Sequence, residues 1–157
     1  MDLAQTSALV EASIKELNVD PVACRGQNPG QWGLTYKGVS VWIDVFNSAT
    51  NNNRWYFQVM SPLLEVPDKN KESFFQNCLE INHSLYGSAI CKKNDWTYVM
   101  LLREAQGLDQ SEVNATLDRV AIYCSDYRGK LQFKFEGSWT PKAAPASPTS
   151  ADGPVNK

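Results

Sequence analysis

The chain has 157 residues and a net charge of −2 at pH 7, and it is 43% hydrophobic and 20% charged. Such a composition is typical of an ordinary globular protein, and the length corresponds to one domain. The slight negative charge argues against a nucleic-acid partner, which would need clustered lysine and arginine. No apolar run reaches the ~20 residues of a membrane span, and no signal peptide is recognisable, so the expected location is the cytoplasm, without membrane contact.

The first predicted element is an amphipathic helix over residues 3–17. Its apolar side chains recur at helical spacing, at Leu3, Val10, Ile14 and Leu17. Asp2 stands where a capping residue is needed, because its side chain can accept a hydrogen bond from the first turn.

Three strands are predicted next, over residues 31–36, 39–46 and 54–61, with Pro62 ending the third. The links between them are short, which favours an antiparallel meander. Asp44 is expected either on the surface of the second strand or as a charge at the edge of the strand ladder.

A second helix is predicted over residues 70–86, followed by Gly87 as a left-handed stop. One side of this helix is a wide, mostly apolar arc that could touch both a sheet and a second subunit; its residues are Phe74, Phe75, Cys78, Leu79, Ile81, Asn82, Leu85 and Tyr86.

A hairpin is predicted over residues 88–92 and 96–103, and a third helix follows it. Asp109 and Glu112 form the capping box of that helix. Its apolar stripe is interrupted at Gly129. Beyond this point the pattern fits either a frayed helix or a strand, and we favour the helix.

Residues 140–157 are rich in proline, alanine and serine and have no apolar stripe. Such a segment cannot offset the entropy lost on ordering, so a disordered tail is predicted after one domain over residues 1–139.

Catalytic and metal-binding signatures are missing from the sequence. The one histidine, His83, falls on the polar face of the second predicted helix. The four cysteines are too scattered for a zinc site and are expected to be buried free thiols: Cys24, Cys78, Cys91 and Cys124. We therefore expect no enzyme, no metal and no cofactor.

Aromatic residues are abundant in the first three strands, and alternation places them on both faces of a sheet. Either one face is covered by a helix or second subunit, or it offers a binding patch. The sequence leaves both possibilities open.

The order of these elements resembles that of the YbjN-like family, which is described as sensory transduction regulators of bacteria. The resemblance is sharpest at Ile81-Asn82 and Tyr86-Gly87, at the hairpin, at Leu108-Asp109 with Glu112, at Asp118 and over residues 123–131. It implies an α+β fold like that of class I type III secretion chaperones, in the order α-β-β-β-α-β-β-α, with an antiparallel sheet and helices packed on it.

The resemblance further implies a homodimer that binds protein segments. Candidate dimer contacts are Phe74, Phe75, Cys78, Leu79 and Tyr86. On alternation alone, candidate contacts with the partner protein are Trp32, Tyr36, Trp42 and Trp55.

The function predicted is a non-enzymatic, chaperone-like adaptor or regulator that binds an apolar segment of an unidentified partner protein. The alternative is a small-molecule-binding protein or enzyme with a pocket between sheet and helices. A third possibility is a dimer whose apolar arcs serve self-association alone.

Overall fold

The computed structural model describes residues 1–140, and the tail predicted to be disordered lies, from residue 141 on, outside them. Three helices and five strands follow in the predicted order: α1 (Leu3–Glu16), β1 (Gln31–Tyr36), β2 (Val39–Ser48), β3 (Arg54–Glu65), α2 (Lys71–Asn82), β4 (Ala89–Lys93), β5 (Trp96–Glu104) and α3 (Gln110–Lys134). None of these helices is both long and apolar enough to cross a membrane.

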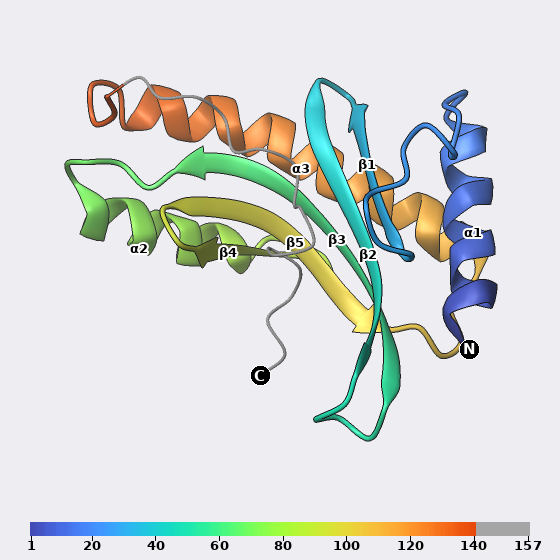
Figure 1. Cartoon of the computed structure of the whole chain (residues 1–157). Coiled ribbons are helices and arrows are strands. Elements are labelled where there is room, and N and C mark those ends of the chain that lie inside the picture. Colours follow the sequence, from blue (N-terminus) through green and yellow to red (C-terminus); the bar gives the residue numbers. More distant parts are fainter. Residues whose placement is uncertain (141–157) are drawn as a thin grey trace.

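The strands form one antiparallel sheet in the order β1-β2-β3-β5-β4. The first three strands make the predicted meander, and the β4–β5 hairpin joins it through β5 (Figure 1). The α+β class and the element order are therefore confirmed.

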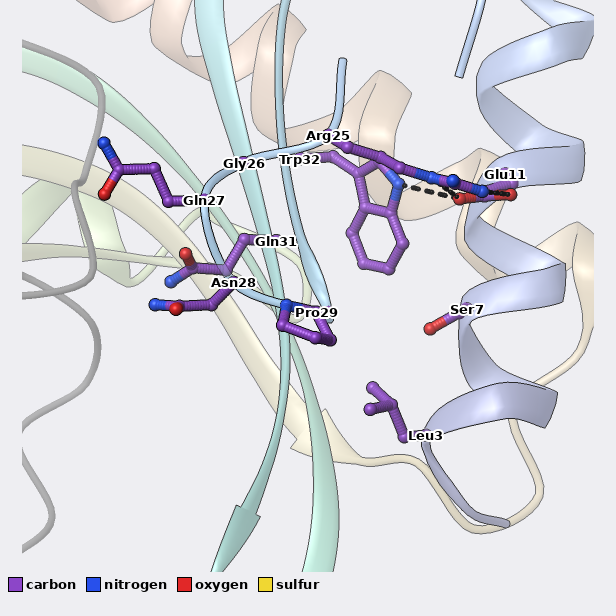
Figure 2. Close-up of a pocket in the computed structure, with 11 residues that line it drawn as sticks. Leu3, Ser7, Glu11, Arg25, Gly26, Gln27, Asn28, Pro29, Gln31 and Trp32 are labelled. Atoms are coloured by element: carbon purple, nitrogen blue, oxygen red, sulfur yellow. Dashed lines mark hydrogen bonds and ion pairs between the residues drawn. The ribbon is translucent and has the colours of Figure 1, made fainter. Parts of the chain in front are cut away.

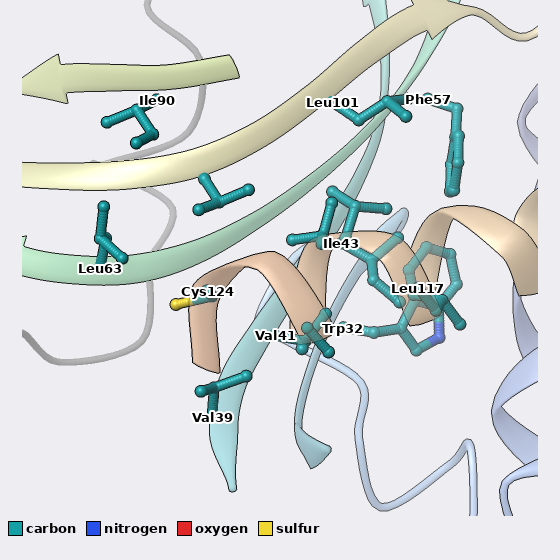
Figure 3. Close-up of a cluster of buried hydrophobic side chains, with 14 of the residues drawn as sticks. Trp32, Val39, Val41, Ile43, Phe57, Leu63, Ile90, Leu101, Leu117 and Cys124 are labelled. Atoms are coloured by element: carbon teal, nitrogen blue, oxygen red, sulfur yellow. The ribbon is translucent and has the colours of Figure 1, made fainter. Parts of the chain in front are cut away.

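Helix α3 packs along one face of the sheet, against β2, β3 and β5, with α1 beside it; α2 lies at the β4 side (Figure 1). We call the face against α3 the inner face and the opposite one the outer face. Figure 3 shows the buried side chains between the sheet and α3, among them Ile43, Phe57 and Leu117, each at most 1% exposed. Burying side chains of this size stabilises the fold by about 1.5–3 kcal/mol each.

The sequence predicted that Pro62 ends the third strand. Strand β3 instead continues to Glu65. The register against β5 shifts between Pro62 and Leu64, so the strand passes the proline through a bulge. Arg128 on α3 donates hydrogen bonds to the carbonyls of Pro62, at 2.5 Å, and Leu63, at 3.1 Å. Because these groups are satisfied from another element, the strand can continue.

Helix α2 is shorter than predicted and ends at Asn82, not Tyr86. The side-chain amide of Asn82 pairs with the backbone of Ile90 in β4. Its Oδ1 accepts from the backbone N–H of Ile90 at 2.6 Å, and its Nδ2 donates to the carbonyl of Ile90 at 3.3 Å. Gly87 has a positive φ of 63°, but it lies in the turn that leads to β4. The chain thus leaves the helix early to make this connection.

Both predicted helix caps are present. Asp2 and Asp109 each accept a hydrogen bond from the third helical residue, and Gln5 and Glu112 complete the two capping boxes. Helix α3 then continues through Gly129 to Lys134. The favoured helical interpretation of this region is confirmed.

Asp44 was predicted on the surface, and this prediction is wrong: its side chain is only 5% exposed. It alternates with Ile43 and Val45 of the core, so it lies on the outer face. Gln31 of β1 and Gln58 of β3 are its register partners and flank it on both sides.

Candidate functional site

A cleft of about 380 Å³ separates α1 from the segment that leads into β1. Figure 2 shows Leu3, Ser7 and Glu11 of α1 facing this cleft. They are spaced four residues apart and therefore share one side of the helix. The opposite wall is the segment of residues 25–31, and Trp32 lies between the two walls.

The opposite wall is held by backbone hydrogen bonds that extend the sheet beyond β1. Gly26 donates to the carbonyl of Gln31 at 2.7 Å, and Gly33 donates to that of Cys24 at 2.8 Å. Gly30 is required for this course, because its φ is +85° and a Cβ there would lie 2.4 Å from the carbonyl oxygen of Val45. The cleft is thus part of the folded framework.

One end of the cleft carries a charged cluster. The guanidinium of Arg25 donates to both carboxylate oxygens of Glu11, at 2.7 and 2.9 Å. The indole of Trp32 donates to the same carboxylate at 3.3 Å. The hydrogen bond from Arg25 is the main reason that the pKa of Glu11 lies below its usual value. At neutral pH this end therefore presents an ionised pair that fixes the ring of Trp32.

The remaining lining of the cleft is suited to binding and offers no acid–base pair. Leu3, Pro29 and Trp32 supply apolar surface, and Ser7 and Asn28 supply neutral polar groups. Such a mixture can hold an apolar side chain and hydrogen-bond a backbone beside it. Within residues 1–140, no three or more His, Cys, Asp or Glu side chains are grouped to hold a metal ion.

The structure separates the four aromatic residues predicted to contact a partner. Trp32 is 4% exposed and lines the cleft. Trp42 is buried on the outer face, with its ring centroid 5.9 Å from that of Tyr98. Tyr36 donates a 2.6 Å hydrogen bond to Asp118 on α3, and Trp55 lines a separate hollow near the N-terminus.

The predicted dimer contacts are also divided. Phe74 and Cys78 belong to the core, and the ring of Phe74 packs edge-on against Phe135. Phe75 is half-buried, whereas Leu79 and Tyr86 are 70% and 77% exposed. Only the last three residues present surface to a second molecule.

Sequence reasoning missed most of the cleft. Leu3 was recognised as an apolar helix residue, but the row it forms with Ser7 and Glu11 has ordinary polar members and gives no periodic signal. The irregular segment of residues 25–31 offered even less, because its hydrogen bonds to β1 become visible only in the fold.

Comparison with solved structures supports the fold. One similar structure is the ExsC–ExsE complex, with a TM-score of 0.63 at 12% identity, covering 83% of this chain and 97% of that one. Another is the HopA1–SchA chaperone–effector complex, with a TM-score of 0.58 at 10% identity over 82% and 98% of the chains. A third is the type III secretion chaperone SycH of Yersinia pestis with a fragment of YscM2, with a TM-score of 0.55 at 14% identity over 80% and 98%.

A search of curated protein sequences finds no match. The model of one protein family does match, over residues 6–133, and this family is described as "Putative bacterial sensory transduction regulator". The matched span includes all five strands and α2 and nearly all of α1 and α3. The chain therefore belongs to the YbjN family, and its fold is that of the type III secretion chaperones.

Proposed function

We propose that this protein is a non-enzymatic, chaperone-like adaptor that binds an apolar segment of a partner protein in the cleft between α1 and residues 25–31. The observation that carries the proposal is the cleft itself, which has an apolar lining, a polar rim and walls fixed by the fold. Similar structures include a chaperone–effector complex and a chaperone bound to a protein fragment, which supports a protein as the ligand.

The geometry of the cleft suits an extended peptide. One apolar side chain of the partner would insert between Leu3 and Pro29 and rest on Trp32. The neighbouring backbone of the peptide would meet the polar groups of Ser7 and Asn28. Trp32 thereby keeps the partner-binding role proposed from the sequence, although its exposed area is small.

We also propose that the protein is a homodimer through the exposed side of α2 and the turn after it. Leu79 and Tyr86 are 70% and 77% exposed, and the half-buried Phe75 lies one helical turn before Leu79, so these residues could supply apolar surface to a second subunit.

A small-molecule or catalytic site between sheet and helices has less support. Ile43, Val59 and Leu117 are each at most 1% exposed in that layer. The sheet and α3 are therefore in direct contact there, and the space is filled by side chains.

The test is a selection of random peptides on the purified protein, followed by affinity measurements on two variants. Ser7→Trp fills the cleft with a bulky ring. Ala12→Trp adds the same ring to an exposed position on the same helix. We expect the selected peptides to share an apolar anchor and to bind the wild type and Ala12→Trp alike. Ser7→Trp should bind them at least about tenfold more weakly, which corresponds to a loss of about 1.4 kcal/mol.

Thermal unfolding of both variants is the control for folding. If no peptide is enriched, or if Ser7→Trp binds the peptides as well as Ala12→Trp does, the cleft is not the binding site and the proposal is wrong.

A further inference from the structure

A carboxyl group is enclosed on the outer face of the sheet, where carboxylates are normally in water. Asp44 is 5% exposed. The amide of Gln31 donates to its Oδ1 at 3.1 Å. On the other side Gln58 is 6% exposed, and its amide is directed to the sulfur of Met60 at 3.2 Å. Among residues 1–140, one neutral hydrogen bond thus supports a carboxyl group that is almost removed from solvent.

No cation of the described chain forms an ion pair with Asp44. Within residues 1–140 the ion pairs join Arg25 to Glu11, Lys37 to Asp118, Arg54 to Glu104 and Arg103 to Glu112. Lys93 acts on Asp44 only through its charge, and burial outweighs that effect and raises the pKa of the carboxyl group. A buried charge that has no ion-pair partner is costly, so it calls for a functional explanation.

A second acceptor, beside Asp44, makes no hydrogen bond. Because the amide nitrogen of Gln31 is turned to Asp44, its Oε1 atom is left buried and makes no hydrogen bond. A Cβ at Gly26 would lie 3.5 Å from this oxygen. Buried polar atoms are nearly always satisfied in folded proteins, which makes this unused acceptor the independent sign of a missing donor.

These two acceptors line a pocket of about 180 Å³ beside the edge strand β1. Trp42 forms another part of the wall. In the β1–β2 register Trp42 stands opposite Gly33, which has no side chain to cover it. The pocket therefore combines a carboxylate, a carbonyl-type oxygen and an aromatic ring.

We propose that this pocket binds an arginine side chain, whose guanidinium donates to Asp44 and to Oε1 of Gln31 and stacks against Trp42. A guanidinium carries five donors in a planar fork and stacks on aromatic rings, so it matches two separate acceptors and a ring at once. A lysine ammonium is a compact, strongly hydrated charge and gains less from such a wall.

The source of the arginine rests on the proposed function, since it would belong to the partner segment. Arg25, Gly26, Gln31 and Trp32 line both the cleft and the pocket, so the two are separated only by one segment of chain. Figure 2 shows the amide of Gln31 pointing away from α1, on the far side of that segment. A partner that places an apolar residue in the cleft could place an arginine over the segment into the pocket. The partner segment is thus both apolar and basic.

The test uses a single amino acid as the probe and does not depend on a partner. N-acetyl-arginine amide is titrated into the full chain, and nuclear magnetic resonance follows the side-chain amide of Gln31 and the indole of Trp42. The same titration is made with the lysine analogue and with the citrulline analogue, which has nearly the shape of arginine without its charge. Asp44→Asn removes the charge in the pocket, and Asp126→Asn removes an exposed charge on α3 as the matched control.

We expect the arginine probe to shift both signals in the wild type and in Asp126→Asn. Asp44→Asn should bind it at least about tenfold more weakly, and the lysine and citrulline probes should bind more weakly than arginine in the wild type. Equal binding to Asp44→Asn, equal binding of citrulline or lysine, or no shift at all would overturn the proposal.

The experiment is separable from the peptide selection. If the selected peptides bind Ser7→Trp as well as the wild type while binding of the arginine probe still depends on Asp44, the pocket proposal is supported and the cleft proposal is wrong. If peptides depend on the cleft but the arginine probe does not bind, the reverse holds.

Discussion

Asp44 shows how strongly one buried residue can couple the stability of the fold to pH. Burial raises its pKa above the value in the unfolded chain, with Gln31 and Lys93 acting in the opposite direction. Such a group opposes folding only where it is ionised, so its cost is absent below the unfolded pKa of about 3.9 and grows as pH rises to the folded pKa. The hydrogen bond from Gln31 can be kept by an asparagine at this position.

Asp44→Asn is therefore expected to raise the free energy of unfolding at about pH 7 and to change it little at about pH 3. Urea unfolding at both pH values measures this difference. Asp126→Asn, which removes an exposed charge, serves as the control. An equal effect of Asp44→Asn at both pH values would mean that the carboxyl group does not ionise at a cost.

The cysteines provide a second prediction for single residues. Cys78 is 5% exposed, and burial raises its pKa to about 11. Because the thiolate is the reactive form, Cys78 should be labelled by an alkylating reagent only as the protein unfolds. Cys91 is half-buried and should react before it. Mass spectrometry after timed labelling gives the order, and early labelling of Cys78 in the native protein would contradict it.

Helices and strands were predictable where the sequence signal is local. The end of an element was not predictable where contacts with another element determine it. The capping boxes at Asp2 and Asp109 use neighbours within one turn, so the sequence alone identified them. Strand β3 passes Pro62 because Arg128 supplies donors from α3, and α2 ends early because Asn82 pairs with β4. These contacts join distant residues and leave no periodic pattern in the sequence.

The connection between α2 and β4 can be tested directly. Asn82→Ala removes both hydrogen bonds to Ile90 and leaves its buried backbone groups without these partners. We expect a loss of roughly 1–3 kcal/mol in the free energy of unfolding. Gln76→Ala, at an exposed position of the same helix, should change it by less than about 0.5 kcal/mol. Equal effects of the two substitutions in urea unfolding would show that the pairing with Ile90 adds nothing.

At the scale of the whole molecule, α3 packs on one face of the sheet, and the candidate site lies to the side of this layer, which made it harder to predict than the fold. Alternation correctly places aromatic residues on both faces, but the four predicted partner contacts do not share one face: the register puts Trp42 on the outer face and the other three on the inner face. Trp32 belongs to the inner set and nevertheless lines the cleft, because α1 approaches it from the side. Trp42 belongs to the outer set and is buried next to Tyr98. Which aromatic residue borders a cleft depends on the placement of α1 and of residues 25–31, and neither follows from periodicity.

The exposed side of α2 and the turn after it would be the contact in the proposed dimer. Leu79 and Tyr86 are mostly in water, and the half-buried Phe75 and Leu85 are near them in the sequence. A stable interface needs about 800 Å² from each partner, so these residues would form its centre and other parts of the chain its rim. Replacing Leu79 and Tyr86 together by lysine would bury two unpaired charges in such a centre, at a cost that a moderate interface cannot offset.

We expect light scattering on the purified wild type, at concentrations on the order of tens of micromolar, to give twice the mass of the 17.6 kDa chain. The double lysine variant should give the mass of one chain. Val22→Lys places the same charge on another exposed apolar residue, in the link after α1, and should leave the dimer intact. A wild type that is strictly monomeric, or a double variant that remains dimeric, would show that α2 is not the contact. Leu79 and Tyr86 would then be free surface, and partner binding would rest on the cleft alone.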